Sequence, residues 1–215
     1  MSLQTHDQVG NRATGDRLGH LAGSGRAAIG AALLLTSPYT PMLFMGEEFD
    51  ASAPWQYFTD HSEEWLVESI REGRQAEFAE HGWSGEVPDP QDPGTVETST
   101  LDWAELEQPE HAAMLNWYRT LIDLRRRLPD VRGAVLGEGA VARDGDLLLV
   151  RRGELNVVAN LGDQPGRLPV APDAEVLAGF GDVSLTGAEV LLGPVSVGLL
   201  LAPPPTGVIP AVVSP

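Results

Sequence analysis

The sequence predicts an α+β fold in which a mainly helical N-terminal part precedes a small antiparallel β domain. The 215 residues include 42% hydrophobic side chains, enough to bury a core. All five tryptophans and all five histidines lie before residue 129, so composition changes near Pro129. Apolar residues recur at helical spacing before this point, whereas short apolar runs alternate with turn residues after it. We therefore expect domains at residues 1–129 and 130–205, and a flexible tail at 206–215.

Two helices are predicted near the N-terminus, over residues 16–22 and 24–35. Ser24 is the expected N-cap of the second helix, because a serine hydroxyl can accept hydrogen bonds from the free amides of a first turn. The apolar residues of this helix form one predicted buried stripe: Ala28, Ile29, Ala32, Leu33 and Leu35.

A continuous apolar run follows at residues 42–45 and ends at Gly46. Such a run is typical of a strand buried on both faces, as in a parallel sheet. Glu47 and Glu48 come next, so both carboxylates are expected at the carboxyl end of that strand, where parallel α/β folds bind ligands. The alternative is a solvated acidic pair at the start of a loop. Nearby aromatic residues either stack on sugar faces or pack under the loop.

The rest of the N-terminal part is predicted to hold two further helices. The first spans residues 62–80, after a capping-box pattern formed by Asp60 and Glu63. Residues 82–100 are rich in proline and are predicted to be an excursion loop without a regular helix. Pro109 opens the last helix, whose apolar residues recur on one face: Met114, Trp117, Leu121, Leu124 and Leu128.

Seven short strands are predicted in the C-terminal part, at residues 134–136, 141–143, 147–150, 156–159, 175–178, 190–192 and 197–201. Asp144-Gly145 is a strong hairpin signal between the second and third strands. Strands with this spacing favour a small antiparallel sandwich or barrel.

Composition narrows the function classes. The formal charge of −17 makes nucleic acid a poor partner, because phosphate binding needs clustered cations. Without cysteine there are no disulfides, iron–sulfur clusters or thiolate zinc sites, and no other metal or cofactor is predicted. The longest apolar run is too short to cross a bilayer and the N-terminus is unlike a signal peptide, so no membrane partner and a cytoplasmic location are expected.

A polar cluster at residues 6–12 is the first candidate site. The cluster combines charged side chains, amides and an imidazole that can donate or accept, and such groups suit hydrogen bonding to sugar hydroxyls. Its members are His6, Asp7, Gln8 and Asn11. A capped turn before the next helix fits the spacing equally well. Residues 23–28 match a dinucleotide-binding pattern. The preceding segment has helical spacing and not the buried strand that such a site needs, so nucleotide binding is disfavoured as a function.

Residues 6–12 and 37–48 closely resemble the last two barrel-strand motifs of the α-amylase superfamily. Residues 55–61, 71–78 and 87–90 narrow the resemblance to the maltooligosyltrehalose trehalohydrolase family, which the chain resembles over most of residues 3–200. The resemblance implies the last βα units of a (β/α)₈ barrel followed by a small antiparallel β-sandwich.

The resemblance also implies a retaining glycosidase that cleaves the α-1,4 bond next to the terminal trehalose unit of maltooligosyl trehalose or a related α-glucan. Asp7 matches the carboxylate that stabilises the transition state, and no cofactor is implied. The substrate-binding residues that it implies are His6, Gln8, Asn11, Glu47 and Glu48.

The resemblance begins at the end of the seventh barrel strand, whereas the family's nucleophile and general acid lie on the fourth and fifth. We therefore expect the isolated chain to lack activity, because Asp7 alone cannot form and break the glycosyl bond. An exposed strand at residues 42–45 predicts self-association through barrel edges, or a mobile N-terminal half. A non-catalytic carbohydrate-binding or interaction module is the alternative function.

Overall fold

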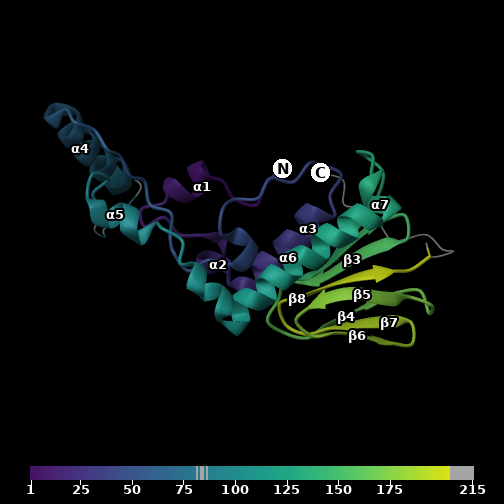
Figure 1. The fold of residues 1–215 in the computed structure, drawn as a ribbon. Helices are drawn as coiled ribbons and strands as arrows, with labels where there is room; N and C mark the ends of the chain where they lie inside the picture. Colours follow the sequence, from purple (N-terminus) through teal and green to yellow (C-terminus); the bar gives the residue numbers. More distant parts are fainter. Residues whose placement is uncertain (81, 83–84, 86, 204–215) are drawn as a thin grey trace.

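A computed structural model describes residues 1–80, 82, 85 and 87–203, so the tail expected at 206–215 lies outside the described residues. The helices α3 and α6 lie side by side over a β-sandwich, while α4 and α5 project from the opposite end of the molecule (Figure 1). The α-helices are α1 (His6–Gly10), α2 (Leu18–Ala22), α3 (Ser24–Leu35), α4 (Glu64–Glu80), α5 (Pro93–Thr98), α6 (Pro109–Arg127) and α7 (Pro129–Arg132). Two 3₁₀ helices are η1 (Glu47–Phe49) and η2 (Trp103–Glu107).

The described strands form two antiparallel sheets, in the orders β1-β2-β3-β8-β5 and β4-β7-β6. Their bounds are β1 (Ala140–Asp144), β2 (Leu147–Arg152), β3 (Leu155–Asn160), β4 (Gly166–Pro169), β5 (Glu175–Phe180), β6 (Val183–Thr186), β7 (Glu189–Leu192) and β8 (Ser196–Leu201). The predicted hairpin is confirmed: Asp144 pairs with Leu147 across a turn in which Gly145 has φ +57°. Residues 134–136 form no strand, and β4 and β6 were not predicted.

Strands β3 and β8 of the five-stranded sheet are buried on both faces. Successive side chains of a strand point to opposite sides, so each strand contacts two layers. Val157 and Ala159 of β3 face the helices, whereas Val158 faces Val190 and Leu192 of the smaller sheet. Three layers result, formed by the helices and the two sheets in turn. The antiparallel β domain is therefore as predicted.

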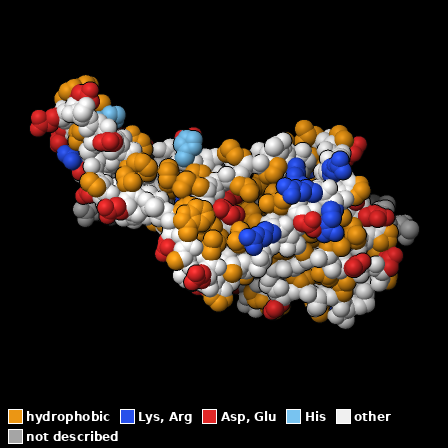
Figure 2. All heavy atoms as spheres, viewed as in Figure 1, with side chains coloured by type: hydrophobic (Ala, Val, Ile, Leu, Met, Phe, Trp, Pro, Cys, Tyr) orange, Lys and Arg blue, Asp and Glu red, His pale blue; other side chains and the backbone are white. Residues whose placement is uncertain are grey.

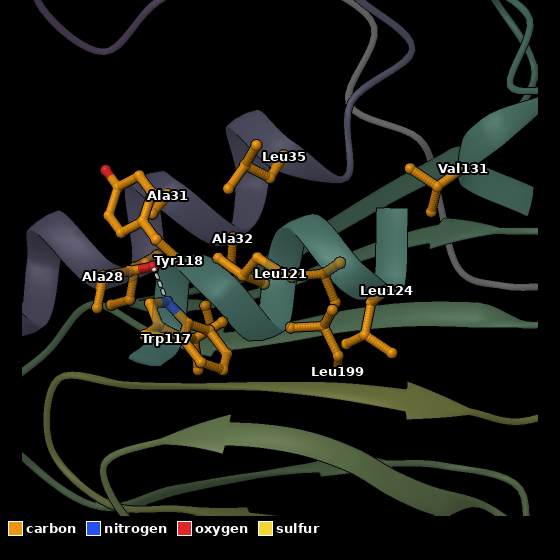
Figure 3. Packing of buried hydrophobic residues seen from close by; sticks show 14 of the residues in the cluster. Ala28, Ala31, Ala32, Leu35, Trp117, Tyr118, Leu121, Leu124, Val131 and Leu199 are labelled. Atoms are coloured by element: carbon orange, nitrogen blue, oxygen red, sulfur yellow. Dashed lines mark hydrogen bonds between the residues drawn. The ribbon is translucent and has the colours of Figure 1, made fainter. Parts of the chain in front are cut away.

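Helices α3 and α6 pack on this sheet through the stripes that their sequences predict. Trp117, Leu121 and Leu124 of α6 lie close to Leu199 of β8, and the indole Nε1 of Trp117 donates to the Ala28 carbonyl at 3.0 Å (Figure 3). The helix over residues 24–35 is confirmed in its bounds. The buried stripe differs slightly, because it includes Ala31 and Leu34 while Leu33 is only partly buried.

Residues 42–44 have no regular secondary structure and Met45 lies in a turn, so this segment does not form the predicted strand. Met42 and Met45 are exposed to 53% and 42%. The Met1 ammonium donates to the Thr40 carbonyl at 3.0 Å, and the Met42 amide donates to the Met1 carbonyl at 2.9 Å. These two bonds have the pattern of a parallel pair, but a strand needs a longer ladder of partners. The prediction of a buried strand is therefore wrong for the described chain.

Two local predictions also differ from the structure. The proline-rich segment 82–100 contains α5, since Pro93 occupies the first turn, where its missing amide costs no hydrogen bond, and Asp92 accepts from the Gly94 amide at 2.8 Å. Gly23, not Ser24, is the N-cap of α3, and the Ser24 hydroxyl instead donates to the Asp50 carboxylate.

Candidate functional site

The first candidate cluster lies on α1, a single helical turn. The Thr5 hydroxyl caps this turn by accepting from the Gln8 amide at 3.4 Å. The imidazole Nε2 of His6 lies 3.1 Å from Oδ1 of Asp7, and their side chains are 73% and 77% exposed. Gln8 is exposed as well, and Asn11 is the exposed C-cap of the turn. These groups are therefore open to a ligand rather than engaged in the core.

The second candidate cluster begins beside the first. Met1, five residues before His6, pairs in the parallel pattern with Thr40 and with Met42, which is five residues before Glu47.

Glu47 points into the protein and not to the rim that the sequence suggested, with 6% of its surface exposed. Its Oε1 accepts from the Tyr118 hydroxyl at 3.4 Å, whereas Oε2 has no hydrogen-bond partner among the described residues. Burial raises the pKa of Glu47 to about 7, although the Phe44 backbone and the Gln4 amide favour the ionised form. Glu48 is half-buried, which leaves part of the expected acidic rim accessible.

The buried side chain of Arg17 holds this loop in place, and no motif in the sequence predicted that role. Its side chain is 1% exposed; Nε donates to the Ala53 carbonyl at 2.5 Å and Nη1 to the Met45 carbonyl at 2.6 Å. The guanidinium carbon also lies 5.3 Å from the centre of the Phe44 ring. Desolvation lowers the pKa of Arg17, against the opposing field of Glu48 and other nearby carboxylates. One buried cation therefore holds both ends of the loop that carries η1.

Other contacts fix the same loop to α6 and η2. Ser52 donates its amide to Glu105 at 3.1 Å and its hydroxyl to the same carboxylate. The Nδ1 atom of His111 lies 2.8 Å from the Phe49 carbonyl oxygen. Phe49 itself is fully buried. The loop after Gly46 is thus a fixed part of the structure, although it has little regular secondary structure.

Aromatic side chains surround this loop. Trp55 makes edge-to-face contacts with Phe44 and Phe58, at centroid distances of 5.8 and 5.3 Å. Trp103 lies 5.6 Å from Phe49 and is 62% exposed. Phe44, Trp55 and Phe58 therefore pack against one another, which is one of the two predicted alternatives, while stacking on sugar faces stays a prediction.

The part of the chain that the structure describes offers neither a membrane-spanning helix nor a cluster of metal ligands. None of its helices has the length and apolar character that crossing a bilayer requires. Within the same residues, no group of three or more acidic, histidine or cysteine side chains is arranged to hold a metal ion.

Comparison with solved structures defines the class of fold. A crystal structure of a protein assigned as an α-amylase, from Salmonella typhimurium, superposes with a TM-score of 0.79 at 36% identity, covering 93% of this chain and 34% of that one. Isomaltulose synthase from Erwinia rhapontici has a TM-score of 0.61 at 16% identity over 95% of this chain and 43% of its own, a likeness of fold alone. The homologues of this chain are glycoside hydrolases of the α-amylase family.

The curated relatives narrow this class. Malto-oligosyltrehalose trehalohydrolase from Rhizobium sp. (strain M-11) is 46% identical over 200 residues, which cover 92% of this chain and 34% of the relative. The enzyme of that name from Mycobacterium tuberculosis (strain ATCC 25618 / H37Rv) is 48% identical over 170 residues, or 78% of this chain and 29% of the relative. The chain corresponds to the C-terminal portion of malto-oligosyltrehalose trehalohydrolases, which confirms the resemblance seen in its sequence.

Two facts set the scope of this relationship. The chain spans about a third of the length of the curated relatives it matches. A family model described as a domain of unknown function, DUF3459, matches residues 130–208, the part that contains the β-sandwich. The candidate site residues all lie before that match.

Proposed function

We propose that this chain supplies the C-terminal part of a retaining glycoside hydrolase that cleaves the α-1,4 bond next to the terminal trehalose unit of maltooligosyl trehalose. The observation that carries the proposal is the exposed His6–Asp7 pair, a few residues after Met1, which pairs in the parallel pattern with Thr40 and Met42. The Rhizobium relative is 46% identical over 92% of this chain. An accessible carboxylate can accept hydrogen bonds from the hydroxyls of a sugar ligand.

In this proposal Asp7 acts by charge and hydrogen bonding. Its carboxylate accepts from ring hydroxyls of the sugar being cleaved and stabilises the positive charge that develops in an oxocarbenium-like transition state. His6, beside it, donates to a neighbouring hydroxyl. Gln8 and Asn11 offer amide groups on the same exposed turn.

Glu47 and Glu48 have different roles in this proposal. Glu48 is half-buried and lies at the rim, where it can accept from a sugar hydroxyl. Glu47 was expected to bind substrate too, but its burial against Tyr118 suits support of the loop from inside. We therefore propose Glu48 as the sugar-binding member of the pair.

Bond cleavage in a retaining glycosidase needs a nucleophile and a general acid besides Asp7. By family resemblance, those two residues belong to barrel strands that precede the matched region. We propose that residues 1–129 complete the catalytic barrel and that residues 130–205 form the appended β domain. The chain on its own would then not turn over substrate.

The test is trehalose release from maltooligosyl trehalose. The 215-residue chain is assayed alone and after co-expression with the N-terminal two thirds of the Rhizobium relative. We expect no release by the chain alone, and release by the complemented pair that is lost with Asp7→Asn. Asp163→Asn is the matched control, because this carboxylate is 81% exposed in the β domain, where it contacts Arg26.

Release of trehalose by the isolated chain, above an Asp7→Asn background, would refute the proposed division of labour. Complementation that survives Asp7→Asn would refute the assigned role of that carboxylate.

A carbohydrate-binding module is the second candidate function. The observation in its favour is the exposed Trp103 beside further aromatic rings. Such a module would bind α-glucan without needing any complementing chain. It would also leave Asp7→Asn without effect on binding.

A further inference from the structure

A cavity of about 270 Å³ lies beside the candidate site and is not used in the proposed chemistry. It lies between the turn at Met45, the aromatic connection, the end of α5 and η2. Figure 2 shows hydrophobic side chains gathered below α1, between α5 and the N-terminal end of α6. The apolar side chains that line the cavity are Met45, Trp55, Phe58, Val96, Leu101 and Trp103.

The side chains that line the cavity favour one chemical class of ligand. No charged side chain contributes to the lining, which favours a neutral ligand, as does the overall charge of −17 for this chain. Three of its side chains are aromatic, and Trp103 leaves 62% of its surface exposed. Flat aromatic faces pack well on molecules that are apolar on one face and polar at the edge, which describes a pyranose ring.

Hydroxyl groups complete the lining. Ser99 and Thr100 stand at the end of α5, and each already donates its hydroxyl hydrogen to a backbone carbonyl, at 2.8 and 2.9 Å. Thr100 is exposed, so its oxygen retains acceptor capacity toward a ligand hydroxyl. A few polar groups in an aromatic wall are typical of small-molecule sites.

The cavity is connected to the proposed catalytic turn. Trp55, which lines it, lies against α1, since a Cβ atom on Gly10 would be 3.6 Å from the Trp55 ring. Gly10 ends the same turn that carries His6 and Asp7. Met45, in the turn that leads to Glu47, lines the cavity as well. A ligand in the cavity is therefore a neighbour of the proposed site.

We propose that this cavity is a subsite that stacks one neutral glucosyl ring of an α-glucan against Trp103. The inference rests on the proposed function for its substrate class and adds the place where a further sugar of that substrate binds. Its volume falls just below the range of about 300–1,000 Å³ that larger ligands occupy, which suits a single ring. Trp103 is a binding residue in this proposal and takes no part in bond cleavage.

The test uses the 215-residue chain and maltotriose, followed by tryptophan fluorescence and by the indole N–H signals in NMR spectra. We expect saturable binding that Trp103→Ala weakens by about tenfold or more. Trp65→Ala is the matched control, because Trp65 on α4 is 72% exposed but lies outside the cavity. We expect this variant to bind maltotriose as tightly as the wild type does.

Weaker binding by Trp103→Ala could also follow from a disturbed η2, so a second variant leaves Trp103 in place. Val96→Asp places a charge in the cavity wall at a residue that is 41% exposed, and it is expected to weaken maltotriose binding to a similar extent. Absence of saturable binding by the wild type, or equal binding by Trp103→Ala and Trp65→Ala, would overturn the subsite. Neither result bears on the Asp7 assay, so the two proposals fail separately.

Discussion

The hydroxyl of Tyr118 donates a hydrogen bond to Oε1 of Glu47 across 3.4 Å, although the two residues are 71 positions apart in sequence. Tyr118 belongs to α6, the helix that packs on the five-stranded sheet. Burial, with the nearby charge of Glu47, raises the pKa of this phenol, so it stays protonated and can donate. Packing of α6 on the β domain thus fixes the floor of the candidate site.

The first prediction concerns pH. The pKa of Glu47 is raised from 4.5 to about 7, so the folded state binds a proton more tightly than the unfolded chain between these values. The contribution of this group to the free energy of unfolding is therefore greatest below pH 4.5 and falls by up to about 3 kcal/mol as pH rises to 7. Glu47→Gln removes this dependence. Urea unfolding at several pH values should show wild type losing stability relative to the variant as pH rises; parallel curves would contradict the prediction.

The second prediction concerns Arg17. Arg17→Lys keeps the charge but cannot donate to the Met45 and Ala53 carbonyls from two nitrogens at once. One buried carbonyl would lose its partner, so we expect a loss of about 1–3 kcal/mol in the free energy of unfolding. Denaturant unfolding measures this loss. Arg167→Lys, at a side chain that is 73% exposed, is the control and should change little.

The third prediction concerns how α4 is attached. Arg74 lies between the rings of Tyr57 and Phe78, at 4.6 and 5.0 Å, and donates to the Gly10 carbonyl at 2.8 Å. Arg74→Ala should lower the local stability of α4 by about 1–2 kcal/mol. Faster amide hydrogen exchange throughout the helix measures this loss. Glu72→Ala, an exposed position on the same helix, should leave exchange unchanged. Equal protection in both variants would show that Arg74 does not hold the helix.

The fourth prediction concerns the shared core. Leu121 is fully buried between α3 and the sheet, so Leu121→Ala leaves a cavity there. We expect a loss of about 2–5 kcal/mol in the free energy of unfolding. Leu191→Ala, where the side chain is 38% exposed on β7, should cost about 0.5 kcal/mol or less. Similar losses for both variants would place Leu121 outside the core.

Local patterns predicted much of the secondary structure, and their failures have physical causes. The helix at residues 24–35 follows from apolar spacing, and the hairpin at Asp144 follows from turn chemistry. The segment at 42–45 looked like a buried strand because its residues are all apolar. Strand formation depends on a partner ladder, however, and a composition pattern carries no information about that partner.

The same contrast holds within the candidate site. His6, Asp7 and Glu48 could be named from the motif alone, and the structure leaves them accessible. Arg17 could not, because one arginine next to a short helix looks like a surface residue until its two carbonyl partners are known. The burial of Glu47 was hidden for a similar reason, since Tyr118 comes from a distant helix.

By itself, the sequence determined the antiparallel β domain, the relationship to α-amylase-type enzymes and the acids proposed for the candidate site. Those features depend on local periodicity, turn residues and motifs, which lie within a few positions of one another. The tertiary structure alone decided which acid is buried, which arginine holds the loop and which tryptophan faces solvent beside a cavity. These properties arise from contacts between distant segments, such as Trp117 with Ala28 at a separation of 89 residues, and only the packed chain brings them together.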